Sequence, residues 1–174
     1  VVTDINIAKL NQQLTIWSAQ LWSAEGAHVL EQVRSRFGMS DEQVRDLRLG
    51  LRPAGGSDWA AISNSFASVD RLIIPFYDVE TILPASAQGR ATDLSTPKDA
   101  RWASLSGRGW AKAGRYVHPA GAQHPALIVC EGPTDALSAY GAGFESVAVR
   151  GASLASKVAP SIAAIAEGRI VAIV

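Results

Sequence analysis

The last third of the chain alternates between short apolar runs and helix-like segments, and this alternation limits the possible folds more than any other feature. Residues Ala126–Cys130 form a continuous apolar run, which is typical of a strand buried on both faces. Further apolar runs and helical periodicity predict, in order, a helix over Thr134–Tyr140, a strand over Ser146–Val149, a helix over Leu154–Ala166 and a strand over Arg169–Val174. Strands that alternate with helices in this way predict a parallel sheet with crossover helices.

The first 125 residues have a different character. Apolar residues at helical spacing from Leu10 onward, followed by Gly38 and a capping-box pattern at Ser40–Gln43, predict two helices joined by a tight turn. Arg71–Tyr77 is predicted to be a strand, and Pro75 places it at a sheet edge or at a strand end. Residues 84–125 predict short strands and long loops. We therefore expect an α+β or α/β chain, with a mixed helical and strand subdomain over residues 1–122 and a parallel-sheet subdomain over residues 123–174.

Composition excludes several classes of protein. The 174 residues are 48% hydrophobic and 18% charged, which favours a folded domain over disorder, and 16 Lys+Arg balance 16 Asp+Glu. The single cysteine, Cys130, excludes an internal disulfide framework and a multi-cysteine zinc ribbon, so no zinc is expected in this chain. Because no run approaches the roughly 18 apolar residues of a membrane helix and the start lacks a signal-like pattern, we expect a cytoplasmic protein without membrane contact. The missing initiator Met and the apolar last residues suggest a piece of a longer protein.

Two carboxylates follow the first buried strand. Glu131 comes directly after it, where functional groups collect in open parallel sheets, and Gly132 allows a ligand or backbone to approach closely. Asp135 falls in the first turn of the next helix, near enough to share a site with Glu131. Asp135 could equally be a helix-capping residue, and periodicity alone leaves the two interpretations about even.

The segment Leu127–Leu137, which contains both carboxylates, resembles the first motif of the TOPRIM domain, shared by bacterial-type (DnaG-like) primases, topoisomerases and some nucleases. Gly143–Leu154, with Gly151, is similar to the primase version of the second strand and its glycine turn. The resemblance implies a Rossmann-like TOPRIM subdomain in which Glu131 is catalytic or organises Mg²⁺ (or Mn²⁺) and Asp135 supports it. The family's third strand ends in an Asp-x-Asp metal pair, and this chain stops at Val174, where that pair should follow. We therefore expect a TOPRIM subdomain truncated at its third strand, and Glu131 alone would bind metal poorly.

The resemblance extends upstream to the polymerase core of primases. The segments that carry it lie in family order: Val29–Ser40, Gln43–Leu51, Arg71–Asp78, Gln88–Arg90 and Thr96–Trp102. Two departures stand out, since Asp99 replaces the usual aromatic residue and Asp78–Thr81 replaces a glycine-bearing turn. With no zinc-ribbon module in the chain, the resemblance favours a phage, plasmid or prophage primase or a primase–helicase.

A basic stretch rich in aromatic residues lies between residues 96 and 118. Cations beside aromatic faces are a common means of holding single-stranded nucleic acid, although a solvated surface with tryptophans packed beneath it is slightly more probable from the residues alone. Together with the primase resemblance, the stretch and the preceding turn make Arg90, Lys98, Arg101 and Trp102 the predicted contacts to nucleic acid or nucleotide phosphates. Weaker candidates are Arg108, Lys112 and Arg115.

These observations predict a primase catalytic core that makes short RNA primers. The expected partners are a single-stranded DNA template, ribonucleoside triphosphates and a replicative helicase, with Gly132 and Gly151 near the bound nucleotide. This chain alone is expected to be inactive or weakly active. Two alternatives remain open: a TOPRIM nuclease or topoisomerase, and a non-catalytic TOPRIM module that binds nucleic acid or a helicase.

Overall fold

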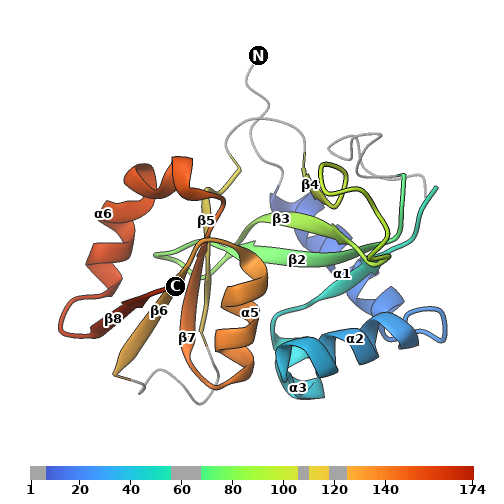
Figure 1. The fold of residues 1–174 in the computed structure, drawn as a ribbon, viewed down its shortest axis with the longest axis horizontal. Helices are drawn as coiled ribbons and strands as arrows, with labels where there is room; N and C mark the ends of the chain where they lie inside the picture. Colours follow the sequence, from blue (N-terminus) through green and yellow to red (C-terminus); the bar gives the residue numbers. More distant parts are fainter. Residues whose placement is uncertain (1–6, 56–67, 106–109, 118–124) are drawn as a thin grey trace. The chain divides into compact units, whose positions relative to one another are not determined.

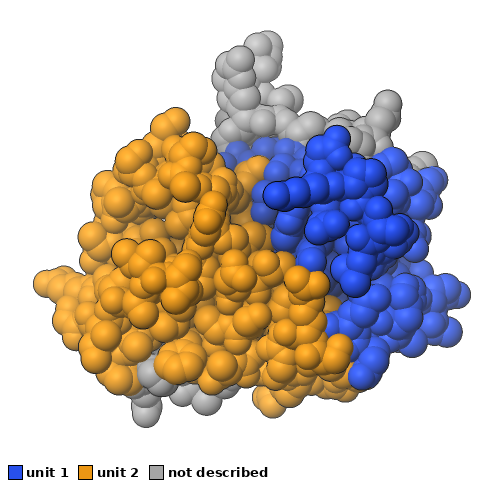
Figure 2. All heavy atoms as spheres, in the orientation of Figure 1, with its two compact units in different colours: residues 1–32, 47–75, 84–110 blue, residues 33–46, 76–83, 111–174 orange. Residues whose placement is uncertain are grey.

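The computed structural model describes residues 7–55, 68–105, 110–117 and 125–174. The chain divides into two compact units, shown in different colours in Figure 2. The first unit contains residues 1–32, 47–75 and 84–110, and the second contains residues 33–46, 76–83 and 111–174. Each unit therefore draws on several segments, whereas the sequence-based division at residue 122 follows chain order.

The first unit is built on a four-stranded sheet covered by helix α1 (Figure 1). Its strand order is β1-β2-β3-β4, and the elements are α1 (Ile7–Leu21), β1 (Gly50–Arg52), β2 (Arg71–Tyr77), β3 (Pro84–Ala91) and β4 (Trp102–Ser104). Leu10, Leu14 and Trp17 recur on one face of α1 and pack with Ile73 of β2 and Ala87 of β3. Burial of this apolar face stabilises both the helix and the sheet beneath it.

Strand β2 corrects one prediction from the sequence. Pro75 predicted an edge or a strand end, but β2 lies between β1 and β3, and all seven of its residues are buried. The proline is accommodated because the ladder between β1 and β2 ends at the pair Gly50–Ile73, two residues before Pro75. The missing N–H group of Pro75 therefore does not leave any β1 carbonyl without its hydrogen-bond donor.

Helices α2 (Ala27–Phe37) and α3 (Asp41–Asp46) are joined by the predicted turn. Gly38 has a φ of 65°, and the Ser40 and Gln43 amides donate to each other's side-chain oxygens at 2.8 and 3.2 Å, which confirms the capping box. The Gln43 amide group also donates to the Tyr140 carbonyl at 3.2 Å. This bond ties α3 to the end of the helix that follows the first parallel strand.

The second unit contains the predicted parallel strands. Its sheet has the order β5-β7-β6-β8, formed by β5 (Ala113–Tyr116), β6 (Ala126–Cys130), β7 (Glu145–Val149) and β8 (Ile170–Ile173). Strand β6 is parallel to both β7 and β8, as predicted, and β5 adds an antiparallel edge to β7. The sheet is therefore mixed, and the chain is an α+β fold with two sheets.

Helices α5 (Pro133–Gly141) and α6 (Ala155–Ile165) cover opposite faces of this sheet. Val158 of α6 packs in one apolar cluster with Leu127 and Val147, whereas the Ser146 hydroxyl, on the other face of β7, donates to the Ala136 carbonyl of α5 at 2.8 Å. This is the doubly wound arrangement, in which successive crossovers run in opposite directions across the sheet. No helix within the described ranges is long and apolar enough to cross a membrane.

Candidate active site

Glu131 lies at the point where the direction of the crossovers reverses. Strand β6 connects to β7 on one side, and the chain after β7 crosses back past β6 to β8 on the other side, so the residues that follow β6 lie where the connections reverse, at the carboxyl ends of the parallel strands. The Glu131 amide donates to the Val174 carbonyl at 3.2 Å, and the Glu131 carbonyl accepts from the Gly151 amide at 3.4 Å. Glu131 is therefore held between the end of β8 and the loop after β7, and its side chain is exposed.

Asp135 lies beside Glu131, in the first turn of α5. Gly132 caps this helix in an extended conformation (φ −134°, ψ 164°), and Pro133 occupies its first turn. A Cβ atom on Gly132 would lie 3.8 Å from Asp135 Oδ2, so the carboxylate of Asp135 turns back toward the residue after Glu131. The two exposed carboxylates therefore lie at the same edge of the sheet.

Cys130, the residue before Glu131, is a buried core residue. Burial, with a smaller contribution from the charge of Asp135, raises the pKa of the Cys130 thiol to about 11. The thiol is therefore protonated at neutral pH and does not act as a nucleophile at this edge.

Gly151 follows β7 at the same edge of the sheet. Its φ of 93° and ψ of 150° lie in a region that side chains other than glycine rarely adopt. This conformation turns the Gly151 amide toward the Glu131 carbonyl and starts the short helical turn Ala152–Leu154. The glycine predicted from the motif is therefore required by the backbone.

The described residues do not form a complete metal site. Within the described ranges, no three His, Cys, Asp or Glu side chains lie close enough together to hold one ion. Mg²⁺ is commonly bound by one or two carboxylates together with water and substrate phosphates. Glu131 and Asp135 could supply such carboxylates, but they do not amount to a full set of protein ligands.

An apolar hollow of about 560 Å³ adjoins the same edge. Ala155, Ala159 and Ala163 of α6 line one wall, Val171 and Ile173 of β8 line the other, and Glu131 also borders it. The hollow therefore combines a large apolar surface with a carboxylate.

The predicted basic contacts belong to the first unit. Arg90 of β3 is 9% exposed, pairs with Trp102 of β4, and holds its guanidinium 5.8 Å from that ring. Arg101 Nη2 donates to the carbonyls of Leu94 and Thr96, both at 3.3 Å, and thereby braces the loop between β3 and β4. Lys98 lies in this loop and is exposed. Arg90, Arg101 and Trp102 thus meet around one hairpin, which presents Lys98.

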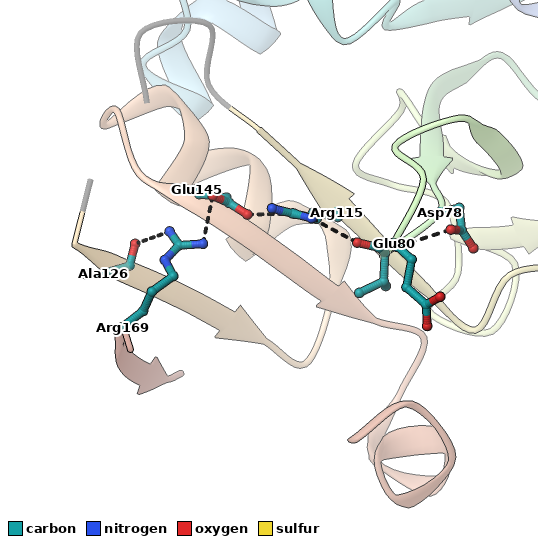
Figure 3. Close-up of polar contacts among 7 residues, drawn as sticks. Asp78, Glu80, Arg115, Ala126, Glu145 and Arg169 are labelled. Carbon is teal, nitrogen blue, oxygen red and sulfur yellow. Dashed lines mark hydrogen bonds and ion pairs between the residues drawn. The ribbon is translucent and has the colours of Figure 1, made fainter. Parts of the chain in front are cut away.

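A buried ion network in the second unit was not predicted. Glu145, at the start of β7, accepts bonds from Arg115 Nε at 2.6 Å and Arg169 Nη1 at 2.8 Å, and its side chain is only 3% exposed (Figure 3). The same arginines donate to the carbonyls of Val79 and Ala126 at 3.0 and 3.1 Å. Glu145 and Ala126 each begin a parallel strand, so the network lies at the amino ends of these strands, opposite the edge that carries Glu131.

The turn between β2 and β3 shows how the chain replaces a glycine-bearing turn. The carboxylate of Asp78 accepts bonds from the amides of Glu80 and Thr81 at 3.1 and 2.8 Å, and these bonds hold the pKa of Asp78 below its usual range. Ile82 takes the left-handed position with a φ of 57°. The Asp78 cap therefore supports a backbone conformation that β-branched residues rarely adopt.

Comparison with solved structures identifies the fold. The E. coli primase catalytic core superposes with a TM-score of 0.68 at 18% identity over 96% of this chain and 61% of that structure. A DnaG primase catalytic domain bound to ssDNA gives a TM-score of 0.66 at 17% identity, covering 96% of this chain and 59% of the other. The Aquifex aeolicus primase, with zinc-binding and RNA polymerase domains, gives 0.67 at 17% identity, covering 97% and 47%.

These similarities confirm the predicted resemblance at the level of the fold: the chain has the fold of DnaG primase catalytic cores. It spans about three fifths of the length of the catalytic-core structures that it matches, 58% in one and 61% in another. No family model matches the sequence. No curated protein matches it either.

Proposed function

We propose that this chain, with its DnaG-type catalytic-core fold, is a fragment of the catalytic core of a primase that synthesises short RNA primers on single-stranded DNA. The observation that carries the proposal is the position of Glu131 at the crossover reversal of a sheet that superposes on primase cores. The neighbouring structures include a catalytic domain bound to ssDNA, which supports a nucleic-acid partner. Ribonucleoside triphosphates would be the second substrate, and a replicative helicase is a proposed partner.

Glu131 is the proposed catalytic carboxylate, and Asp135 supports it. The proposed cofactor is Mg²⁺ or Mn²⁺, which would hold substrate phosphates at this edge. Because the described residues lack a third metal ligand, we assign no reaction step to the ion. What the chain itself provides is the fixed backbone on both sides of Glu131 and the open approach at Gly132.

The hairpin of the first unit is the proposed nucleic-acid surface. Lys98 would contact phosphates and Trp102 would offer an aromatic face for base stacking, with the guanidinium of the buried Arg90 held over that ring. Arg101 contributes by bracing the loop that presents Lys98.

A primer-synthesis assay with the natural full-length protein tests the proposal. Single-stranded DNA, ribonucleotides and Mg²⁺ should yield RNA primers, and Glu131→Gln should reduce the yield on the order of a hundredfold or more, because a positioned acid–base group is lost. Glu167→Gln is the matched control, since Glu167 is an exposed carboxylate in the turn before β8, at the opposite edge of the sheet. Unchanged synthesis by Glu131→Gln would refute the role of Glu131.

The incomplete metal site favours one second candidate, a non-catalytic module that binds nucleic acid. Single-stranded DNA binding without primer synthesis, and without any effect of Glu131→Gln, would support that candidate. Strand cleavage in the absence of ribonucleotides would instead indicate a nuclease.

A further inference from the structure

The sheet of the first unit has an apolar and a polar face where β3 and β4 pair. Strand β4 is the edge of this sheet and lies beside β3 (Figure 1). Ala87 of β3 and Ala103 of β4 pack into the core under α1. Because side chains alternate along a strand, their neighbours lie on the opposite face. This hairpin face consists of Ser86, Gln88, Arg90, Trp102 and Ser104.

Gln88 carries an amide group that the hairpin orients but uses only in part. The strand register places Gln88 opposite Ser104, and Gln88 Nε2 donates to Ser104 Oγ at 3.0 Å. Among the described residues this is the one hydrogen bond of the Gln88 side chain, so its Oε1 atom and its second N–H group are available to a ligand. Both residues are partly exposed. The hairpin face therefore presents an acceptor and a donor side by side on an oriented amide.

Trp102 lies next to this amide on the same face. It pairs with Arg90, whose guanidinium lies 5.8 Å from the centre of the ring, and Trp102 is partly exposed. Gln88 is its diagonal neighbour across the two strands, at about 7–8 Å, which is within the reach of aromatic and long side chains. An unpaired base is commonly held by stacking on an aromatic ring and by hydrogen bonds to its edge. Trp102 and Gln88 offer these two kinds of contact together.

Packing of the sheet does not explain why this face is polar. The Ser86 hydroxyl is buried on it, and among the described residues it has no hydrogen-bond partner. A buried hydroxyl without a partner destabilises a fold by about 1–3 kcal/mol. Alanine, which occupies positions 87 and 103 on the other face, would pack without that cost. Contact with a polar ligand is therefore the better explanation for the polar side chains of the hairpin face.

We propose that Gln88 is a specificity-determining residue that binds an unpaired adenine of single-stranded DNA, with the base stacked on Trp102. The inference rests on the proposed function, in which this hairpin holds the template. Adenine suits the amide because Gln88 Oε1 accepts from the N6 amino group while Nε2 donates to the neighbouring ring nitrogen. Ser104 is a positioning residue, since its hydroxyl orients the amide. Lys98 contacts phosphate and adds affinity without sequence preference.

Fluorescence anisotropy with labelled oligodeoxynucleotides tests this contact in the natural full-length protein. The quantity measured is the ratio of the affinity for oligodeoxyadenylate to that for oligodeoxycytidylate of equal length, because stacking within the free strands cancels when variants are compared. Gln88→Ala should lower this ratio about tenfold, the effect of losing one bidentate base contact. Gln12→Ala is the matched control, since Gln12 is an exposed glutamine on α1, which covers the other face of the sheet. An unchanged ratio in Gln88→Ala would overturn the proposal.

Two further variants separate base contact from phosphate contact. Gln88→Glu keeps the size of the side chain but can only accept, so the ratio should shift toward cytosine, whose N4 amino group donates to a carboxylate. Lys98→Gln should weaken both oligonucleotides equally and reduce the salt dependence of binding. Lys98 is chosen because it is exposed in this hairpin, whereas Arg115 pairs with Glu145 and Arg108 lies outside the described residues.

The outcomes distinguish this inference from the proposed function. Equal weakening of both oligonucleotides by Gln88→Ala, with a reduced salt dependence, would refute the base contact and assign Gln88 to the phosphate backbone. A lowered ratio in Gln88→Ala, in a protein that makes no primers, would support the base contact and refute the primase function. Primer synthesis by a protein whose ratio is unchanged in Gln88→Ala would do the reverse.

Discussion

Replacement of Glu145 by alanine should destabilise the second unit more than any surface substitution. The Glu145 carboxylate is 3% exposed and pairs with Arg115 and Arg169, whose side chains are 16% and 18% exposed. Its removal leaves two largely buried guanidinium groups without this carboxylate. Breaking a buried pair costs about 3–5 kcal/mol, and the carbonyl bonds that both arginines keep place the expected loss near the lower end, about 3 kcal/mol.

Two further variants separate charge from packing. Glu145→Gln keeps the side-chain size and one acceptor oxygen, so we expect a loss of about 1.5–3 kcal/mol, the usual value of a hydrogen bond to a charged group. Arg34→Gln is the control, because the pair of Arg34 and Asp41 has side chains 38% and 45% exposed and should contribute less than about 1 kcal/mol.

Because the tyrosines and the described tryptophans lie in different units, the loss of stability can be assigned to the second unit. Tyr77, Tyr116 and Tyr140 all belong to the second unit, whereas the described tryptophans, residues 17, 22, 102 and 110, belong to the first. Urea unfolding followed by tyrosine signals in the near-ultraviolet should show the full loss, together with a decrease in Tm of roughly 10 °C. A loss below about 1 kcal/mol in Glu145→Ala would refute the reasoning, since it would mean that desolvation cancels the attraction within the network.

Three other substitutions and one chemical modification test local structure. Gly141→Ala should lower the free energy of unfolding by about 3 kcal/mol, because the new Cβ would lie 2.0 Å from the Phe37 carbonyl oxygen. Gly132→Ala is the matched control. It should change the free energy of unfolding by less than about 0.5 kcal/mol, because its Cβ has room and its φ is ordinary. The pKa of Asp78 is lowered in the folded state, so its contribution is present at neutral pH. Asp78→Ala should cost about 1 kcal/mol at pH 7, and this cost should shrink as pH falls through the lowered pKa. With its pKa raised to about 11, Cys130 should react with iodoacetamide at pH 8 far more slowly in the folded protein than in urea, and equal rates would contradict its burial.

The strands and helices from Ala126 onward could be predicted because each has one dominant local signal. Strand β6 is apolar throughout and occupies the predicted residues, and α5 begins at Pro133, one residue before the predicted start. Strand β5 gave no such signal. Its sequence, Ala113–Tyr116, contains a glycine because the Phe76 ring takes the place of a side chain there: a Cβ on Gly114 would lie 2.7 Å from Phe76 Cδ1. That requirement comes from a residue nearly forty positions earlier, so no local pattern reveals it.

The same limit explains what could be predicted of the candidate site. Glu131 and Asp135 are four residues apart, so a strand followed by a helix is enough to bring them to one edge. The partners of Glu145 are 30 and 24 residues away from it in sequence, and only the strand register brings the three together. From the sequence alone, Arg115 is therefore a candidate phosphate contact, because its acidic partner lies 30 residues away. The one local clue was a carboxylate directly before the predicted strand Ser146–Val149, because a carboxylate buried with that strand needs a cation as partner.

The charges at the two edges of the second sheet differ in burial, so their roles in stability and in function can be tested separately. At the amino edge, Glu145 is neutralised by buried arginines, so changes there should alter stability and leave ligand affinity unaffected. At the carboxyl edge, Glu131 and Asp135 are exposed, and exposed charges contribute little to folding because water solvates them. Their substitution should therefore leave urea stability within about 0.5 kcal/mol of the unmodified protein while reducing primer synthesis by the natural full-length protein. If the two measurements separate in this way, the charges at the carboxyl edge act on the ligand and those at the amino edge act on the fold.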